Sequence, residues 1–246
     1  MKLKCLSCEA LARMVYLCAA QSPHLVDVSM FKLGLHNRPG DLRGHLQEAV
    51  DAVPAGEYDA IVLGYGVCGQ ATVGLAARHT PLVIPRAHDC MTLYLGNRQR
   101  YQMQFEDEPG TYWYTVDYLE RHRPGDALGA TALSTDTSAQ YEEFVRKYGQ
   151  DNADYLMETM GAWQSHYARA AMIDTGVGDS AAAAAHAERV AGQRGWRFEK
   201  LVGDLVLIRK LLRGEWDEDF LRVPPGESIG MSYDANIVEC AAHRAA

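Results

Sequence analysis

The chain has 246 residues, a formal net charge of −8 and an isoelectric point near 5.6. This acidic balance argues against a protein that binds nucleic acid or an anionic membrane through a basic surface. No apolar run approaches the roughly 20 residues of a membrane span. The hydrophobic content of 48% is that of a folded globular protein, and we expect a cytoplasmic one.

Short apolar runs alternate with amphipathic segments in the first half of the chain. The predicted strands are 3–8, 26–36, 58–69 and 81–90, and the predicted helices are 9–21, 42–53, 69–78 and 91–105. Such alternation forms a parallel sheet with helices on both faces. Ligands bind these sheets beyond the carboxyl ends of the strands, so a site is expected at the strand exits.

The second half of the chain starts with a connection rich in Pro, Gly and aromatic residues, 106–137, and a strongly helical stretch, 138–170. The β-α pattern then returns, with strands at 170–178, 197–204 and 220–229, helices at 180–196 and 205–216, and a tail at 231–246. The predicted fold is α/β, with two Rossmann-like lobes, mainly parallel sheets and a cleft between them. Residues 1–115 are expected to form the N-terminal lobe, and 116–246 the helical connection and the second α/β lobe.

Three of the six cysteines, Cys8, Cys68 and Cys90, stand at predicted strand exits, and the second predicted strand ends at His36. Because the carboxyl ends of parallel strands share one edge of a sheet, these four side chains are expected to meet there. Thiolate and imidazole are ligands for zinc or for an iron–sulfur cluster such as 4Fe–4S. The alternative is that the thiols fill the core, which is where we place Cys18 on its apolar helical face.

Two further residues adjoin Cys90 in the sequence HDC. His88 and Asp89 are candidate catalytic residues, since an imidazole and a carboxylate beside a metal can transfer protons or orient a ligand. At helical spacing Arg98 and Tyr101 share a face, where they could bind a carboxylate or phosphate of a small-molecule substrate. A solvated helix face is the alternative for this pair.

The segment 109–115 places three aromatic residues in a row. Strand alternation would put Trp113 on one side and Tyr112 on the other. Tyr112 and Trp113 are therefore candidate substrate-binding residues in a lid over the cleft. Packing between the lobes is the alternative explanation.

The glycines of GYGVCG, residues 64–69, nominally match a dinucleotide-binding loop. The motif follows the third predicted strand instead of the first, and Cys68 stands where the backbone would approach pyrophosphate. Nucleotide binding with core cysteines is thus a weaker alternative to the metal site.

Several motifs together are similar to the bacterial and archaeal family DUF1638, a domain of unknown function. They are LSCEALAR, GLHNRPGDL, YDAIVLGYGVCG, PLVIPRAHDCMTLYLGNRQRY, IDTGVGD and GEWDEDFLRVPPG. The resemblance implies a cysteine pattern at Cys8, Cys68 and Cys90 with histidines at His36 and His88, and leaves Cys5 outside it. It also implies an association with corrinoid-dependent methyltransferases for methylated amines.

The leading hypothesis is a cytoplasmic protein that binds a metal ion or cluster and acts as an enzyme of methylamine or one-carbon metabolism. The second hypothesis is a non-catalytic accessory protein that binds a corrinoid, a metal or a methyltransferase partner. The third is a nucleotide-binding α/β protein.

Overall fold

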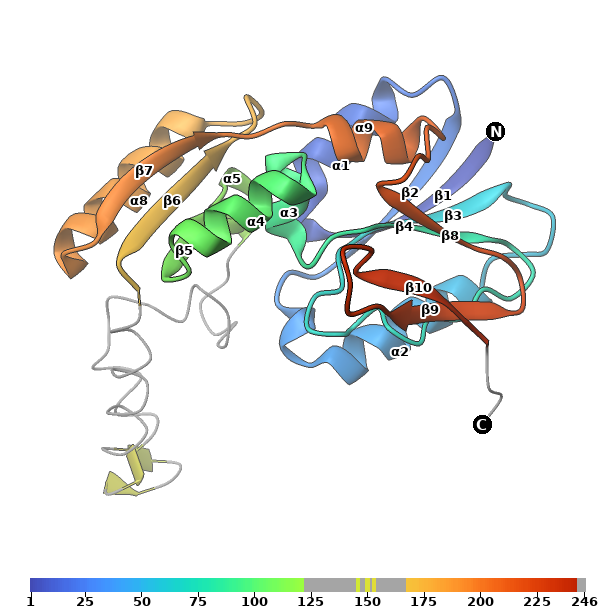
Figure 1. The fold of residues 1–246 in the computed structure, drawn as a ribbon, viewed down its shortest axis with the longest axis horizontal. Helices are drawn as coiled ribbons and strands as arrows, with labels where there is room; N and C mark the ends of the chain where they lie inside the picture. The colour runs from blue at the N-terminus through green and yellow to red at the C-terminus, as the bar shows by residue number, and fades with distance from the viewer. Residues whose placement is uncertain (122–144, 147–148, 151, 154–166, 243–246) are drawn as a thin grey trace.

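The computed structural model describes residues 1–121, 145–146, 149–150, 152–153 and 167–242. These residues form an α/β fold with parallel strands and helices packed against them (Figure 1), which confirms the predicted fold class. In this described part, no helix has the length and apolar character needed to cross a membrane. The predicted cleft between two lobes stays a prediction.

The larger sheet has five strands in the order β2-β1-β3-β4-β8. The first four strands are parallel, and β8 runs antiparallel to β4. Their bounds are Lys2–Cys8 for β1, Leu25–Phe31 for β2, Ala60–Gly64 for β3, Leu82–Pro85 for β4 and Phe220–Val223 for β8. The helices around this sheet are η1 (Glu9–Leu11), α1 (Ala12–Ala20), η2 (Leu35–Asn37), α2 (Pro39–Asp51), α3 (Cys90–Leu95), α4 (Arg98–Asp107) and α9 (Val206–Leu212).

A second, parallel sheet has the order β5-β6-β7, and a two-stranded antiparallel hairpin joins β9 to β10. The bounds are β5 (Thr111–Tyr114), α5 (Val116–Arg121), β6 (Arg169–Asp174), α8 (Ser180–Arg194), β7 (Arg197–Val202), β9 (Glu227–Met231) and β10 (Val238–Ala242). Strand pairing crosses the predicted boundary at residue 115 twice, since β5 pairs with β6 and β8 pairs with β4. The division into 1–115 and 116–246 stays a prediction.

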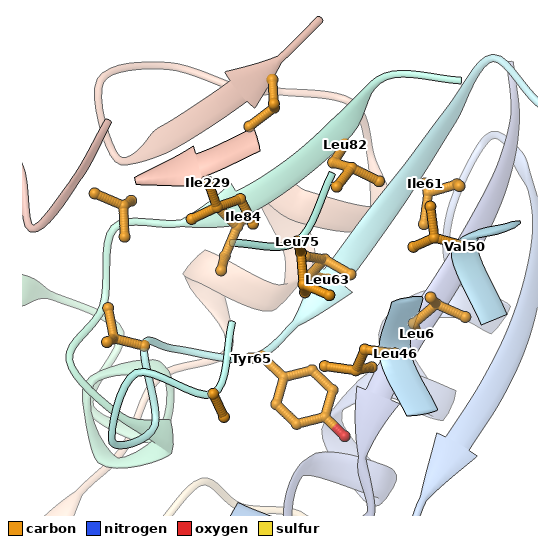
Figure 2. Packing of buried hydrophobic residues seen from close by; sticks show 14 of the residues in the cluster. Leu6, Leu46, Val50, Ile61, Leu63, Tyr65, Leu75, Leu82, Ile84 and Ile229 are labelled. Carbon is orange, nitrogen blue, oxygen red and sulfur yellow. The ribbon is translucent and has the colours of Figure 1, made fainter. Parts of the chain in front are cut away.

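Both faces of the central parallel strands β1, β3 and β4 are largely buried, as is usual in parallel sheets. One face carries Leu6 and Leu63, which pack with Leu46 of α2 in the aliphatic cluster of Figure 2. The opposite face packs against α1 and α9. Since side chains alternate along a strand, Cys5 belongs to the second face and Cys8 to the first. The two cysteines of the Cys-x-x-Cys pair therefore point in opposite directions.

Several predicted elements differ from the structure. The second strand ends at Phe31, five residues before His36. No helix forms over 69–78, because residues 68–70 are all left-handed, with φ of 47°, 65° and 69°. The predicted tail is wrong over 231–242, because these residues form part of the β9–β10 hairpin. Most of the predicted helix 138–170 lies outside the described residues.

The single helix predicted over 91–105 is divided at Gly96, which has φ of 73° and ends α3. Asn97 then caps α4, and its side chain accepts the backbone N–H of Arg100 at 2.9 Å. Asn97→Ala should lower the free energy of unfolding by about 1 kcal/mol, because it removes this capping bond. Urea denaturation measures the change. Gln99→Ala, in the same first turn but without a capping role, is the control, and an equal loss there would contradict the assignment.

Candidate metal centre

Cys8, His36, Cys68 and Cys90 line one small cavity of about 20 Å³. They come from four separate segments of the chain, each at or beyond the carboxyl end of a parallel strand. The cavity has room for about one water molecule or one ion.

Two of these thiols are fixed where a strand passes into a helix. Cys8 is the last residue of β1 and the cap of η1, where its sulfur accepts the backbone N–H of Ala10 at 3.4 Å. Cys90 is the first residue of α3, and the preceding Asp89 caps that helix by accepting the N–H groups of Met91 and Thr92. Local capping chemistry thus positions both sulfurs.

Cys68 lies in the loop after β3, which is paired with the HDC loop after β4. The N–H of Val67 donates to Ala87 O at 2.8 Å, and the N–H of Cys68 donates to His88 O at 2.9 Å. Cys68 itself has φ of 47°, in the left-handed region that costs energy for a residue other than glycine. Strained backbone conformations of this kind are common at functional sites, so the φ of Cys68 makes this loop a candidate for one.

Burial raises the pKa of all three thiols. The pKa of Cys8 rises to about 11 and that of Cys68 to about 12, and the pKa of Cys90 also rises. Cys8 and Cys68 each raise the pKa of Cys90 further, because charges on neighbouring sulfurs repel. The three thiols are therefore protonated at neutral pH and close enough to interact electrostatically.

Two features favour metal binding over simple core packing. The backbone N–H groups of Gly66 and Cys90 hydrogen-bond to the Cys68 sulfur and oppose the rise in its pKa. Burial lowers the pKa of His36, so its imidazole is neutral at pH 7, the form that binds metals.

Two tyrosines that the sequence motifs did not single out also line the cavity, Tyr65 and Tyr118. The Tyr65 hydroxyl is buried and has no hydrogen-bond partner among the described residues. Its ring lies at the margin of the aliphatic cluster (Figure 2). Buried hydroxyls are nearly always hydrogen-bonded, so Tyr65 suits a ligand in the cavity. In the sequence, the position of Tyr65 between two glycines is the feature that could have indicated a special role for it.

A second pocket, of about 260 Å³, is lined by three of the same four residues, His36, Cys68 and Cys90. Tyr112, Trp113, Tyr118 and Tyr167 form its aromatic walls, and Asp89 adds a carboxyl group. Tyr112 and Trp113 lie on opposite faces of β5, since Tyr112 packs with Tyr114 in the core of the second sheet and Trp113 packs against the core of the first. The predicted strand alternation is confirmed.

The other predicted site residues lie elsewhere. His88, Arg98 and Tyr101 line a separate groove together, away from the cavity of the thiols. Arg98 forms an ion pair with Asp219 at 3.1 Å. The Tyr101 hydroxyl donates to Asp89 at 2.8 Å, so Asp89 connects the two regions.

A family model described as protein of unknown function (DUF1638) matches residues 30–212, most of the chain. The chain belongs to the DUF1638 family. No curated protein and no solved structure matches it. The matched region includes His36, Cys68 and Cys90, whereas Cys8 precedes it.

The donor set of this DUF1638 protein has the right chemistry for a soft or borderline ion, with three thiols and a neutral imidazole. As the side chains stand, no three His, Cys, Asp or Glu residues in the described part of the chain form a ready ligand set. Binding would therefore require the side chains that line the cavity to move closer together and the thiols to lose their protons, which a bound cation promotes.

The raised thiol pKa values predict slow alkylation in this DUF1638 protein. Near pH 7.5, iodoacetamide should label Cys240 first, because its sulfur is exposed, and Cys8 and Cys68 much more slowly, because burial both shields them and keeps them as unreactive thiols. Labelling of Cys8 and Cys68 should accelerate as the pH rises toward 11. Peptide mass spectrometry of metal-free protein measures the order, and rapid labelling of Cys68 would contradict it.

Proposed function

We propose that this protein binds one metal ion, zinc in the first place, through Cys8, Cys68 and Cys90, with His36 as the fourth ligand. The observation that carries the proposal is the convergence of these four side chains, from four strand exits, on one small cavity. Core thiols do not need a neutral imidazole or a strained backbone beside them, and this site has both.

The size of the cavity favours a single ion over a cluster. About 20 Å³ holds one water-sized atom, whereas a 4Fe–4S cluster brings eight heavy atoms and would displace Tyr65 or Tyr118. Mononuclear zinc with three sulfur ligands and one nitrogen ligand is tetrahedral and common. An iron–sulfur cluster is the competing outcome of the test below.

The neighbouring aromatic pocket supports an enzymatic role for the site. Because it shares His36, Cys68 and Cys90 with the thiol cavity, a small-molecule substrate in it would contact the metal ligands. Aromatic walls at Tyr112 and Trp113 suit a methylated ammonium group, in keeping with methylamine or one-carbon metabolism. For this role the fourth position, which His36 would hold at rest, would have to open to the substrate; zinc would then supply a Lewis acid, while the protein would orient the substrate and exclude water.

The alternative form of the proposal is a non-catalytic accessory protein. A partnership with a corrinoid protein or methyltransferase rests on the family resemblance alone. The six unpaired thiols suit a reducing compartment, so we place the protein in the cytoplasm.

Metal and acid-labile sulfide content, with a visible spectrum, tests the proposal on full-length protein purified without oxygen. About one zinc per chain and no colour is the expected result. Absorption near 400 nm with about four irons and four sulfides per chain would show that the site holds an iron–sulfur cluster instead of zinc. No metal, even after incubation with zinc or with iron and sulfide, would overturn the proposal.

A further inference from the structure

A separate, larger groove lies on the other side of the HDC loop from the thiol cavity. It has a volume of about 950 Å³, at the upper end of the range for small-molecule sites. One wall is α4, and the other is the loop between β9 and β10, which lie near each other in Figure 1. The guanidinium of Arg98 on α4 holds that loop by donating to Ala235 O at 2.8 Å.

The α4 wall is a stripe of aromatic rings. The His88 and Tyr101 ring centroids are 6.2 Å apart, and those of Tyr101 and Phe105 are 6.4 Å apart and nearly parallel, at 17°. Phe105 is 55% exposed, and Tyr233 on the loop is 92% exposed. Large aromatic faces left open on both walls of a groove suit a flat ring that stacks on them.

Thr92 offers an unused hydrogen bond in the same groove. Thr92 is 1% exposed and lines the groove. Its hydroxyl has no hydrogen-bond partner in the described part of the chain. A buried hydroxyl without a partner is rare in folded proteins. It can donate to or accept from a ring nitrogen or carbonyl.

The loop wall is strained where it meets the groove. Ile237 has φ of 65°, an outlier for a β-branched residue. Strain of this kind gathers at ligand-binding positions. Three independent features, the ring stripe, the unpaired hydroxyl and the strained loop, thus coincide in one groove.

The charged groups that the structure describes around the groove already have hydrogen-bond partners, and the one cation among them is ion-paired. Among the lining residues that the structure describes, Arg98 is the one arginine, and it forms an ion pair with Asp219. Glu106 accepts the amide of Gln102, and Asp234 accepts from Ser232 and Asn236. A phosphate would therefore find no ready cation here, which favours an uncharged ligand.

We infer that this groove binds an uncharged, planar heteroaromatic ring, of the purine or isoalloxazine kind, stacked on Tyr101 and Phe105 and hydrogen-bonded to Thr92. Such a ligand would contact the HDC loop from the face opposite Cys90. Its binding does not depend on a metal at the thiols.

Calorimetric titration of the full chain with adenosine and with riboflavin tests the inference and distinguishes the two ring types. At least one should bind saturably below about 1 mM. AMP or FMN should bind no more tightly than its uncharged counterpart. Saturation by neither neutral probe would overturn the inference, as would a phosphate-bearing form that binds more than about tenfold more tightly.

Variants locate the site. Phe105→Ala should weaken binding by about fivefold or more, since aromatic stacking contributes at least that much, and the variant should stay folded because the Phe105 side chain is exposed. Thr92→Val should also weaken binding, whereas Thr92→Ser should retain it. Tyr16→Ala, at an exposed aromatic residue on α1, is the matched control. Unchanged binding in Phe105→Ala would place the ligand elsewhere and overturn the assignment.

Discussion

Cys68→Ser is expected to abolish stoichiometric metal binding and to leave the protein folded. Removal of a residue that only orients a ligand costs 10- to 100-fold in metal affinity, so loss of a ligand should cost at least about 100-fold. Serine is nearly isosteric with cysteine and follows the same backbone path. The apo protein should therefore unfold within about 1 kcal/mol of the wild type.

Metal content after dialysis, together with urea denaturation of the apo protein, measures both effects. Cys240→Ser is the matched control, because Cys240 is exposed on β10 and lies outside the cavity. Full metal content in Cys68→Ser would contradict the ligand assignment. Loss of metal in Cys240→Ser would point to a different site or to non-specific binding.

Gly66→Ala is expected to have the largest effect on stability. A Cβ at Gly66 would lie 2.8 Å from Ala87 O and from the backbone N and Cα of Asp89. Backbone atoms cannot rotate away, so the HDC loop must shift. We expect a loss of about 3 kcal/mol in the free energy of unfolding, with reduced metal content because Cys90 moves with the loop.

Gly44→Ala is the matched control, since Gly44 lies in α2 and its added Cβ meets no atom within 4 Å. Alanine is the better helix former, so this variant should gain about 0.5–1 kcal/mol. Urea denaturation compares the two variants. A Gly66→Ala protein as stable as the wild type would show that the two loops are not packed as closely as described.

The local elements were largely predictable, because hydrophobic periodicity determines them. The runs around Leu6, Leu63 and Leu46 gave strands and a helix near their observed positions. The β-α alternation predicted that β1, β3 and β4 run parallel. Parallel strands place their carboxyl ends at one edge of the sheet, which predicted that Cys8, Cys68 and Cys90 would share that edge. The opposite directions of Cys5 and Cys8 are a finding of the structure, in which they pack on different faces of the sheet.

Features that depend on distant partners were not predictable. Nothing local in β8 indicates that it returns to β4 or that β5 joins a second sheet, because strand partners are chosen by tertiary packing. His88 is only two residues from Cys90 in the sequence, yet it lines a different groove. Loops have no period from which the direction of a side chain can be inferred, so the sequence could not show which pocket His88 lines.

The return of β8 to the edge of the sheet has a consequence for how the chain is synthesised. Phe220 of β8 pairs with Pro85 of β4, so a long stretch must leave the ribosome before the sheet is complete. Until then β4 presents an open edge with unpaired backbone groups, the kind of surface on which nascent chains associate. The five-stranded sheet is thus complete only after β8, which follows β4 by a long stretch of chain, has been synthesised.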